Sequence, residues 1–169
     1  MDTPDRPYSS IYAEHYWSGG PAEKTHVYLH GNNLPARFAH AGAYGFTVSE
    51  LGFGTGLNAL LTLHLHSQIA TGHLTYISYE QHPIPLAQLI PIHVAFPPEL
   101  HPHAQALQAV YSTLHAGWNT LHLPNTTLHL YAGDAREGIA THPQPADCWF
   151  LDGFSTANNP QLWEENLLR

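Results

Sequence analysis

The spacing of apolar residues along the chain changes near residue 45. In residues 1–44, which are rich in Tyr, Gly, Pro and Asn, only "THVYLH" (25–30) has the pattern of a strand, and the turn residues "GNN" follow it. From residue 45 onward, strand-like and helix-like stretches alternate, as expected for a parallel sheet with crossover helices. The sequence therefore predicts an α/β fold, with an N-terminal segment over 1–44 that contains a short strand and a core over 45–169.

Four stretches of the core have the composition of strands. β-branched, aromatic or continuous apolar residues occupy 44–51, 73–80, 126–135 with its turn, and 146–154. The last of these is an unbroken apolar run, which favours a strand buried on both faces. Helical spacing and helix-starting prolines predict helices over 56–70, 82–90, the second half of 99–115, and 159–169.

The composition is typical of a globular domain. The chain has 169 residues, 43% of them hydrophobic, which is enough for one domain with a buried core. No apolar run approaches the roughly 18 to 20 residues that span a membrane. The start, "MDTPDRPYSS", lacks the basic and apolar regions of a signal peptide, so we expect a cytoplasmic protein without a membrane partner. Cys148 is the only cysteine, which excludes an intrachain disulfide and a cysteine metal cluster.

The charge balance limits the ligands that the chain could bind. Lys and Arg total 5 against 13 Asp and Glu, a formal net charge of −8, which argues against a nucleic-acid surface contained in this segment. The 15 histidines are mostly neutral at pH 7. His64 and His66 would not share a helix face, His101 and His103 flank a proline, and no HExxH or CxxC motif occurs. We therefore expect scattered surface histidines and no metal site.

Each predicted strand ends at an acidic residue or reaches one directly afterwards. These acids are Glu50, Glu80, Asp134 and Asp152. In open α/β sheets, ligands bind beyond the carboxyl ends of the strands. The four carboxylates are therefore predicted to converge on one crevice.

The stretch "ELGFGTGLNALL" (50–61) places three glycines directly behind the first of these acids. It departs from the dinucleotide fingerprint Gly-x-Gly-x-x-Gly, because position 57 is Leu57, and the carboxylate of Glu50 would repel a pyrophosphate. A cationic or zwitterionic ligand fits better. S-adenosyl-L-methionine has an amino-acid group and a sulfonium that could lie against glycine backbone near a carboxylate.

The other acids could contact further groups of S-adenosyl-L-methionine. Glu80 is placed to accept two hydrogen bonds from a ribose diol. Asp134 could accept one from the adenine amino group. Asp152 would then face the group that receives the methyl.

Several stretches resemble one enzyme family. "ELGFGTGLN", "SYEQHP", "AGDARE" and "FLDGFSTANNPQLW" are similar to the methyltransferase domain of the MnmC/MnmD-type tRNA wobble-uridine modification enzymes, and "GGPAEKTHVYLHGNNLPARF" (19–38) agrees with it. The resemblance implies a Rossmann-like class I S-adenosyl-L-methionine-dependent methyltransferase fold, truncated after the fourth strand and the following helix. It also implies that 5-aminomethyl-2-thiouridine in the tRNA anticodon is converted to its methylaminomethyl form.

Carried over position by position, the resemblance gives each candidate residue a role. The cofactor-binding residues would be Glu50, Gly52, Gly54, Gly56, Glu80 and Asp134. Asp152 would be catalytic, because an aliphatic ammonium must lose a proton before it attacks, and a carboxylate can orient it and help accept that proton. Phe154 would stack on the uracil, and Asn33 and Arg37 match positions of substrate contacts. An oxidase domain or a protein partner would be supplied separately, and most tRNA phosphate contacts would lie outside this segment.

Three alternatives remain open on the sequence. The first is a methyltransferase of the same fold that acts on a small amine, which fits the acidic residues equally well and the net charge better. The second is a non-catalytic, truncated domain that binds a nucleotide or a protein. A nicotinamide dehydrogenase is the third, and Leu57 in place of the last fingerprint glycine counts against it.

Overall fold

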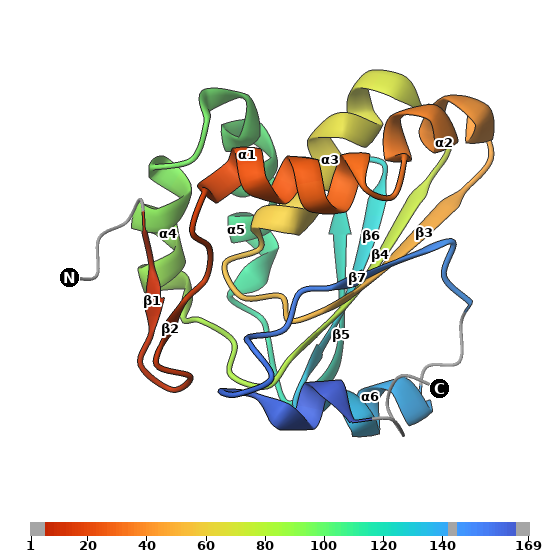
Figure 1. The fold of residues 1–169 in the computed structure, drawn as a ribbon. Helices are drawn as coiled ribbons and strands as arrows, with labels where there is room; N and C mark the ends of the chain where they lie inside the picture. The colour runs from red at the N-terminus through yellow and green to blue at the C-terminus, as the bar shows by residue number, and fades with distance from the viewer. Residues whose placement is uncertain (1–5, 142–144, 165–169) are drawn as a thin grey trace.

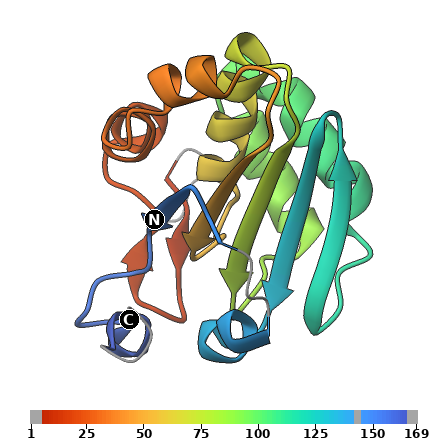
Figure 2. The same ribbon diagram turned by 90° about the vertical axis from the view of Figure 1, so that its right-hand side faces the viewer.

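A five-stranded sheet forms the centre of the computed structural model, which describes residues 6–141 and 145–164. The strands lie side by side in the order β5-β6-β4-β3-β7 (Figure 2). Their bounds are Phe46–Leu51 (β3), Leu74–Glu80 (β4), Gly117–Leu123 (β5), Thr126–Ala132 (β6) and Cys148–Leu151 (β7). All neighbouring pairs are parallel except β5 with β6. The predicted α/β class with a central parallel sheet is confirmed.

Helices α1 to α5 gather on one side of this sheet, and α6 lies on the other side, beside the carboxyl end of β6 (Figure 1). The helices are α1 (Gly20–Lys24), η1 (Thr25–His30), α2 (Leu34–Ala41), α3 (Leu57–Ile69), α4 (Leu86–Val94), η2 (Pro98–Leu100), α5 (His101–Tyr111), α6 (Ala135–Thr141) and η3 (Pro160–Trp163). Two short strands, β1 (Tyr8–Ser9) and β2 (Glu14–His15), pair apart from the main sheet. Within the described ranges, none of the helices is long and apolar enough to cross a membrane.

The main hydrophobic core lies between the sheet and helices α1 to α5. Strands β3 and β4 bury nearly every residue, which agrees with their central positions in a sheet covered on both faces. Leu29, Leu34 and Phe38 of the N-terminal segment join the same cluster as the leucines of α3. A smaller cluster on the opposite face consists of Leu51, Ile77, Tyr79 and Ala135.

The strand predicted over 25–30 is wrong, because these residues form the π-helix η1, which continues α1 without a break. Strand propensity is a weak preference that packing overrides. As a helix, the segment buries Leu29 in the core and brings Lys24 and Tyr28, four positions apart, to one carboxylate. The division of the chain at residue 44 stays a prediction.

The sequence patterns did not predict β5, which pairs antiparallel with β6 at the edge of the sheet. Its buried residues, Leu121 and Leu123, alternate with the exposed Thr120 and His122. The connection to β6 turns at Asn125, whose φ of 50° is left-handed. Because we expected parallel strands with continuous apolar runs, this half-exposed strand was missed. The short helix α6 was missed as well, since only Ala135 fell in the predicted turn and no element was predicted for residues 136–141.

The helix predicted over 159–169 is wrong for residues 160–164. Pro160–Trp163 form only a 3-10 turn, and Glu164 is extended. The indole Nε1–H of Trp163 donates to the carbonyl of Phe154 at 2.8 Å, which holds the turn against the preceding loop. The remainder of the predicted helix, 165–169, lies outside the described residues.

Candidate functional site

The carboxyl ends of the parallel strands open into a cavity of about 210 Å³. It is lined by the loop after β3, the ends of β4, β6 and β7, the segment around β2, and α1. Six of the predicted site residues line this cavity, namely Gly52, Gly54, Glu80, Asp134, Asp152 and Phe154. The other four, Asn33, Arg37, Glu50 and Gly56, are absent from its wall. The predicted convergence of strand ends therefore brings three of the four acids into one space.

The loop 52–56 follows β3 so tightly that its glycines cannot be replaced without strain. Gly52, Gly54 and Gly56 have φ values of 88°, 52° and 77°, a region that side chains rarely adopt. A Cβ on Gly52 would lie 2.9 Å from the carbonyl oxygen of Asp152, and one on Gly54 would lie 2.9 Å from the ring of Tyr16. The loop therefore presents bare backbone to the cavity, as close approach of a ligand requires.

Glu80 is tied to the glycine loop. Its Oε2 accepts the backbone N–H of Gly54 at 2.8 Å, and its Oε1 accepts that of His82 at 2.9 Å. Burial raises the pKa of the Glu80 carboxyl, and the two hydrogen bonds oppose that rise. Because a carboxylate has about four acceptor positions, Glu80 keeps capacity for hydroxyl donors from a ligand.

Asp134 lies across the cavity, where it begins α6. Its carboxylate accepts the backbone N–H of Arg136 at 2.9 Å and the Nε–H of the same residue at 3.0 Å, and it forms an ion pair with that guanidinium. The hydrogen bonds from Arg136 hold the pKa of Asp134 below its usual value. A contact between Asp134 and an adenine amino group stays a prediction, and Arg136 would share the carboxylate.

His93 of α4 supports the glycine loop from behind. Its Nε2 lies 2.9 Å from the carbonyl oxygen of Thr55, and its Nδ1 lies 3.0 Å from Nε2 of Gln108. Burial lowers the pKa of His93, so the ring is neutral and donates from Nε2 while Nδ1 accepts from the Gln108 amide. The sequence analysis missed this support because nothing local marks one histidine among 15.

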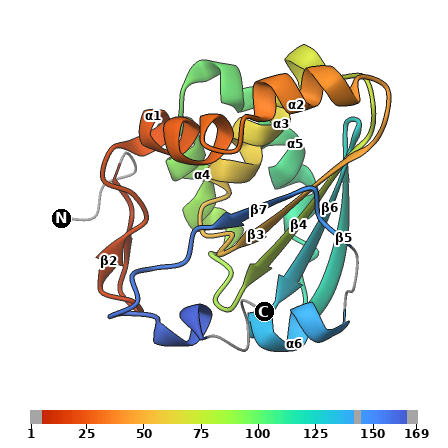
Figure 3. The same ribbon diagram turned by 45° about the vertical axis from the view of Figure 1, so that its right-hand side comes forward.

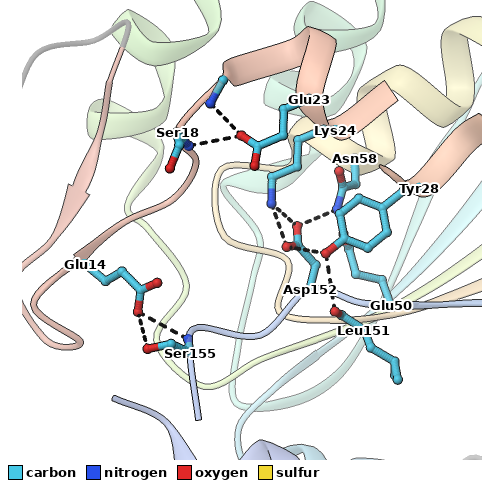
Figure 4. A network of polar contacts seen from close by, with 11 residues as sticks. Glu14, Ser18, Glu23, Lys24, Tyr28, Glu50, Asn58, Leu151, Asp152 and Ser155 are labelled. Atoms are coloured by element: carbon cyan, nitrogen blue, oxygen red, sulfur yellow. Dashed lines mark hydrogen bonds and ion pairs between the residues drawn. The ribbon is translucent and has the colours of Figure 1, made fainter. Parts of the chain in front are cut away.

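We define the Asp152 cluster as Lys24, Tyr28, Glu50, Asn58 and Asp152, which meet on the other side of the glycine loop (Figure 4). The ammonium of Lys24 lies 2.6 Å from both oxygens of the Asp152 carboxylate. The hydroxyl of Tyr28 donates to Oδ1 at 2.7 Å, and the amide of Asn58 donates to Oδ2 at 2.6 Å. Residues from α1, η1 and α3 thus converge on the carboxylate that follows β7.

Glu50 is the member of this cluster that lies behind Asn58, outside the cavity wall. It is 1% exposed, and its oxygens accept from the amide of Asn58 at 2.9 Å and from the hydroxyl of Ser78 at 3.0 Å. Burial, with a smaller contribution from the charge of Asp152, raises the pKa of Glu50 to about 8. The Asn58 amide therefore bridges the carboxyl group of Glu50, which is mostly protonated at pH 7, and that of Asp152, which lines the cavity.

Lys24, Tyr28 and Asn58 were all missed at the sequence level. Asn58 belongs to the quoted motif "ELGFGTGLN", so its position directly after the glycines was an available signal. Tyr28 lies within residues 25–30, for which a strand was predicted, and Lys24 directly precedes them. Reading that segment as a helix would have placed both residues on one face.

Phe154 is packed between two tyrosines of the N-terminal segment. Its ring stacks on Tyr12, with centroids 4.5 Å apart, and meets Tyr16 edge-on at 5.2 Å. Next to it, the carboxylate of Glu14 accepts the hydroxyl of Ser155 at 2.9 Å and the amide of Asn158 at 3.0 Å. The β1–β2 hairpin thus holds the loop after β7, and stacking of Phe154 on a base stays a prediction.

Asn33 and Arg37 lie away from the cavity wall. Asn33 takes a left-handed φ of 52° directly before α2. The guanidinium of Arg37 donates to the carbonyl of Asp147 and lies 5.1 Å from the centroid of the Phe46 ring. Both residues have local structural partners, and their roles as substrate contacts remain predictions.

The lining of the cavity could hold a ligand that carries hydroxyl groups and a positive charge. On one side, bare glycine backbone and the buried, hydrogen-bonded Glu80 suit a hydroxylated and positively charged molecule. On the other side, a carboxylate is held in place by three donors. Gly52 joins the two sides, because its Cα hydrogens face the backbone of Asp152.

Comparisons with known proteins point to one family. Residues 98–169 match a family described as S-adenosyl-L-methionine-dependent methyltransferase. Over 95% of its length the chain is 38% identical to the tRNA 5-methylaminomethyl-2-thiouridine biosynthesis bifunctional protein MnmC of Hahella chejuensis, and 40% identical to that of an Azoarcus species. The chain spans only 27% and 26% of the length of these two relatives.

A solved structure shares the fold. The crystal structure of MNMC2 from Aquifex aeolicus superposes with a TM-score of 0.71 and 20% sequence identity, covering 99% of this chain and 53% of the other. The predicted Rossmann-like methyltransferase architecture is therefore confirmed.

Proposed function

Because the chain belongs with the MnmC-related S-adenosyl-L-methionine-dependent methyltransferases, we propose that it methylates the amine of 5-aminomethyl-2-thiouridine at the tRNA wobble position. The observation that carries this proposal is the position of Asp152, with Lys24 and Asn58 beside it, in the same cavity as the glycine loop and Glu80. A methyl donor and an amine acceptor must meet, and the cavity has a suitable surface for each. Such a substrate would place the reaction in the cytoplasm.

The glycine loop and Glu80 would hold the methyl donor. Gly52 and Gly54 allow its close approach, and Glu80 would accept hydrogen bonds from its ribose hydroxyls. Asp134 would receive the adenine amino group. S-adenosyl-L-methionine, when bound, would supply an electrophilic methyl group. Gly56 would act indirectly by starting α3, and Glu50 by anchoring Asn58.

Asp152 would position the acceptor. Its carboxylate is rigid, because three side chains from separate elements fix both of its oxygens. The side chains fixed around this carboxylate would define the place where the amine lies beside the methyl donor, and alignment of the reacting atoms supplies most of the acceleration in such a reaction. Phe154, beside Tyr12, would offer an aromatic face to the uracil.

The net charge of −8 favours a second candidate, a small aliphatic amine as acceptor. A chain with few basic residues has little to bind tRNA phosphates. The two candidates share the donor site and the Asp152 cluster, and they differ only in what carries the amine.

Transfer of a labelled methyl group separates these candidates. We expect the protein to label tRNA that carries 5-aminomethyl-2-thiouridine and not the same tRNA with an unmodified uridine. Labelling of free small amines at equal or greater efficiency would favour the second candidate. No transfer to any amine would contradict both.

A further inference from the structure

The carboxylate of Asp152 has no free acceptor position. Oδ1 accepts from Lys24 at 2.6 Å and from Tyr28 at 2.7 Å, and Oδ2 accepts from Lys24 and Asn58, each at 2.6 Å. A carboxylate offers about four acceptor positions, so these contacts fill it. An ammonium group entering the cavity would find neither a vacant oxygen nor an uncompensated negative charge.

Lys24 is the charged member among these donors, and it is held firmly. Its side chain is 11% exposed, it contacts both oxygens of Asp152, and its Nζ lies 5.3 Å from the centroid of the Tyr28 ring. Figure 4 shows it reaching from α1 down to the carboxylate, while Asn58 and Tyr28 approach the carboxylate from the opposite side. Breaking such a largely buried ion pair would leave a charge unpaired, which is costly. The pair is therefore expected to persist when a substrate binds.

We propose that Lys24 makes the site select the neutral form of the acceptor amine. This inference rests on the proposed function. Because Lys24 cancels the charge of Asp152, the site gives an ammonium no electrostatic advantage, and the Lys24 charge itself repels one. The amine would leave its proton in solution on binding and arrive with a free lone pair.

The other titratable groups around Lys24 are consistent with this reading. The cluster itself contributes Tyr28 of η1, Glu50 of β3 and Asp152, and Glu23 of α1 lies near enough to act on Tyr28. Burial raises the pKa of Glu50 to about 8, so it is mostly uncharged at pH 7. Glu23 is occupied by the backbone N–H groups of Ser18 and Gly19. The remaining charged or titratable lining residues of the cavity include Glu14, His15, Glu80, Asp134 and Arg136.

The protein needs no group that accepts a proton from the substrate before the methyl group is transferred. One proton passes from the ammonium to the solvent as the substrate binds. The amine nitrogen then forms a bond to the methyl carbon while the bond from that carbon to sulfur breaks. The product forms as a secondary ammonium. Asp152 would hold Lys24, Tyr28 and Asn58 in place beside the amine and need not be protonated itself.

Proton release on binding tests the proposal without any methyl donor. Calorimetric titration in two buffers of different ionisation enthalpy measures the protons exchanged when tRNA carrying 5-aminomethyl-2-thiouridine binds, and the same tRNA with unmodified uridine is subtracted. An aliphatic amine with a pKa near that of lysine, about 10.4, is almost fully protonated at pH 7.5. We expect the protein to release about one proton per bound amine. Lys24→Met should release almost none, and Lys24→Arg, the matched control, should behave like the parent.

The pH dependence of turnover gives a second readout. In Lys24→Met the bare carboxylate would retain the ammonium, so KM should fall while kcat falls about tenfold at pH 7.5, the equivalent of one pKa unit. The two kcat profiles should converge at alkaline pH. A purely structural role for Lys24 would not lower KM.

Several results would overturn the inference. The parent alone decides the central point, because binding without proton release would contradict it even if Lys24→Met failed to fold. Release of equal numbers of protons by the parent and by Lys24→Met would also contradict it. If Lys24→Met turned over faster than the parent at every pH, Lys24 would be a competitor of the substrate. Proton release without methyl transfer would contradict the proposed function alone, whereas no binding of the amine-bearing tRNA would remove both.

Discussion

The two sides of the cavity differ in how far apart in the sequence their contacting residues lie. On the glycine-loop side, which we define as Gly52, Gly54 and Glu80, the joining hydrogen bond spans 26 positions between neighbouring parallel strands. In the Asp152 cluster, Lys24 and Asp152 are 128 positions apart. The first side follows from local backbone geometry and sheet topology. The second exists only once the N-terminal helix has packed beside the end of β7.

The carboxylates of Glu80 and Asp152 also differ in how many hydrogen-bond acceptor positions remain free. Glu80 accepts two backbone N–H groups and keeps acceptor capacity, which suits a ligand with neutral hydroxyls. Asp152 is filled by a lysine, a tyrosine and an asparagine. Two acids at equivalent ends of parallel strands thus have different chemistry, and the difference comes from their neighbours.

The largest expected effect comes from Asp152→Asn. Removing the charge leaves the buried Lys24 without its counter-ion and misplaces the acceptor, so turnover should fall about 100-fold or more. Affinity for S-adenosyl-L-methionine should stay within about threefold, because the glycine-loop side is untouched. Single-turnover methyl transfer with calorimetry would measure both. A loss confined to cofactor affinity would mean that the two sides have been assigned the wrong way round.

Glu80→Ala probes the other side of the comparison. It removes the acceptor for the Gly54 N–H and for a ligand hydroxyl, so the affinity for S-adenosyl-L-methionine should fall about 10- to 100-fold. Glu99→Ala, at an exposed position in η2, is the matched control and should leave the affinity unchanged. Equal affinities of the two variants in a calorimetric titration would contradict the role of Glu80.

His93→Phe should have a smaller effect on the same side. The Thr55 carbonyl and Gln108 would lose their buried partner, which loosens the loop and should weaken cofactor affinity about 3- to 10-fold.

The pH dependence of stability checks the same histidine. Burial lowers the pKa of His93, so its contribution to stability is present above the unfolded value of about 6.5 and is lost as the pH falls below it. Thermal unfolding of His93→Phe should therefore be less sensitive to acid than that of the parent. The exposed His122→Phe is the control, and its acid sensitivity should match that of the parent. Identical slopes for all three proteins would rule out a buried neutral His93.

The smallest effect is expected from Glu50→Gln, at the member of the Asp152 cluster that lies outside the cavity wall. The pKa of Glu50 is raised to about 8 from an ordinary value of 4.5, so the native state holds the proton more tightly than the unfolded state. Stability from this group is complete below pH 4.5 and is lost as the pH rises towards 8. The glutamine removes that slope, and the melting temperature of the variant should gain a few degrees on the parent between pH 5 and 8. Parallel melting curves would show that Glu50 is charged in the fold.

The sequence predicted most of the glycine-loop side. Strand ends and glycine spacing brought Gly54, Glu80, Asp134 and Asp152 to one cavity, because parallel strands share a carboxyl edge. Glu50 was placed at the same edge, yet its side chain points into the core towards Ser78. Successive strand residues face opposite sides, and position in the strand alone does not say which side is open.

Of the Asp152 cluster, the sequence predicted only Glu50 and Asp152 as site residues. Lys24 and Tyr28 lie in or next to a segment whose local pattern favours a strand, and only packing makes it a helix. Arg37 contacts the chain before β7, at Asp147, a partner 110 positions away that the sequence pattern did not indicate. Contacts over more than 100 residues leave no local periodicity, so these partners became visible only in the folded structure.

Calorimetric titration of S-adenosyl-L-methionine into the parent protein, Glu80→Ala and Asp152→Asn tests the division of the cavity most directly. The account predicts saturable binding to the parent, at least tenfold weaker binding to Glu80→Ala, and binding to Asp152→Asn within about threefold of the parent. Equal losses in both variants, or no binding to the parent, would contradict it.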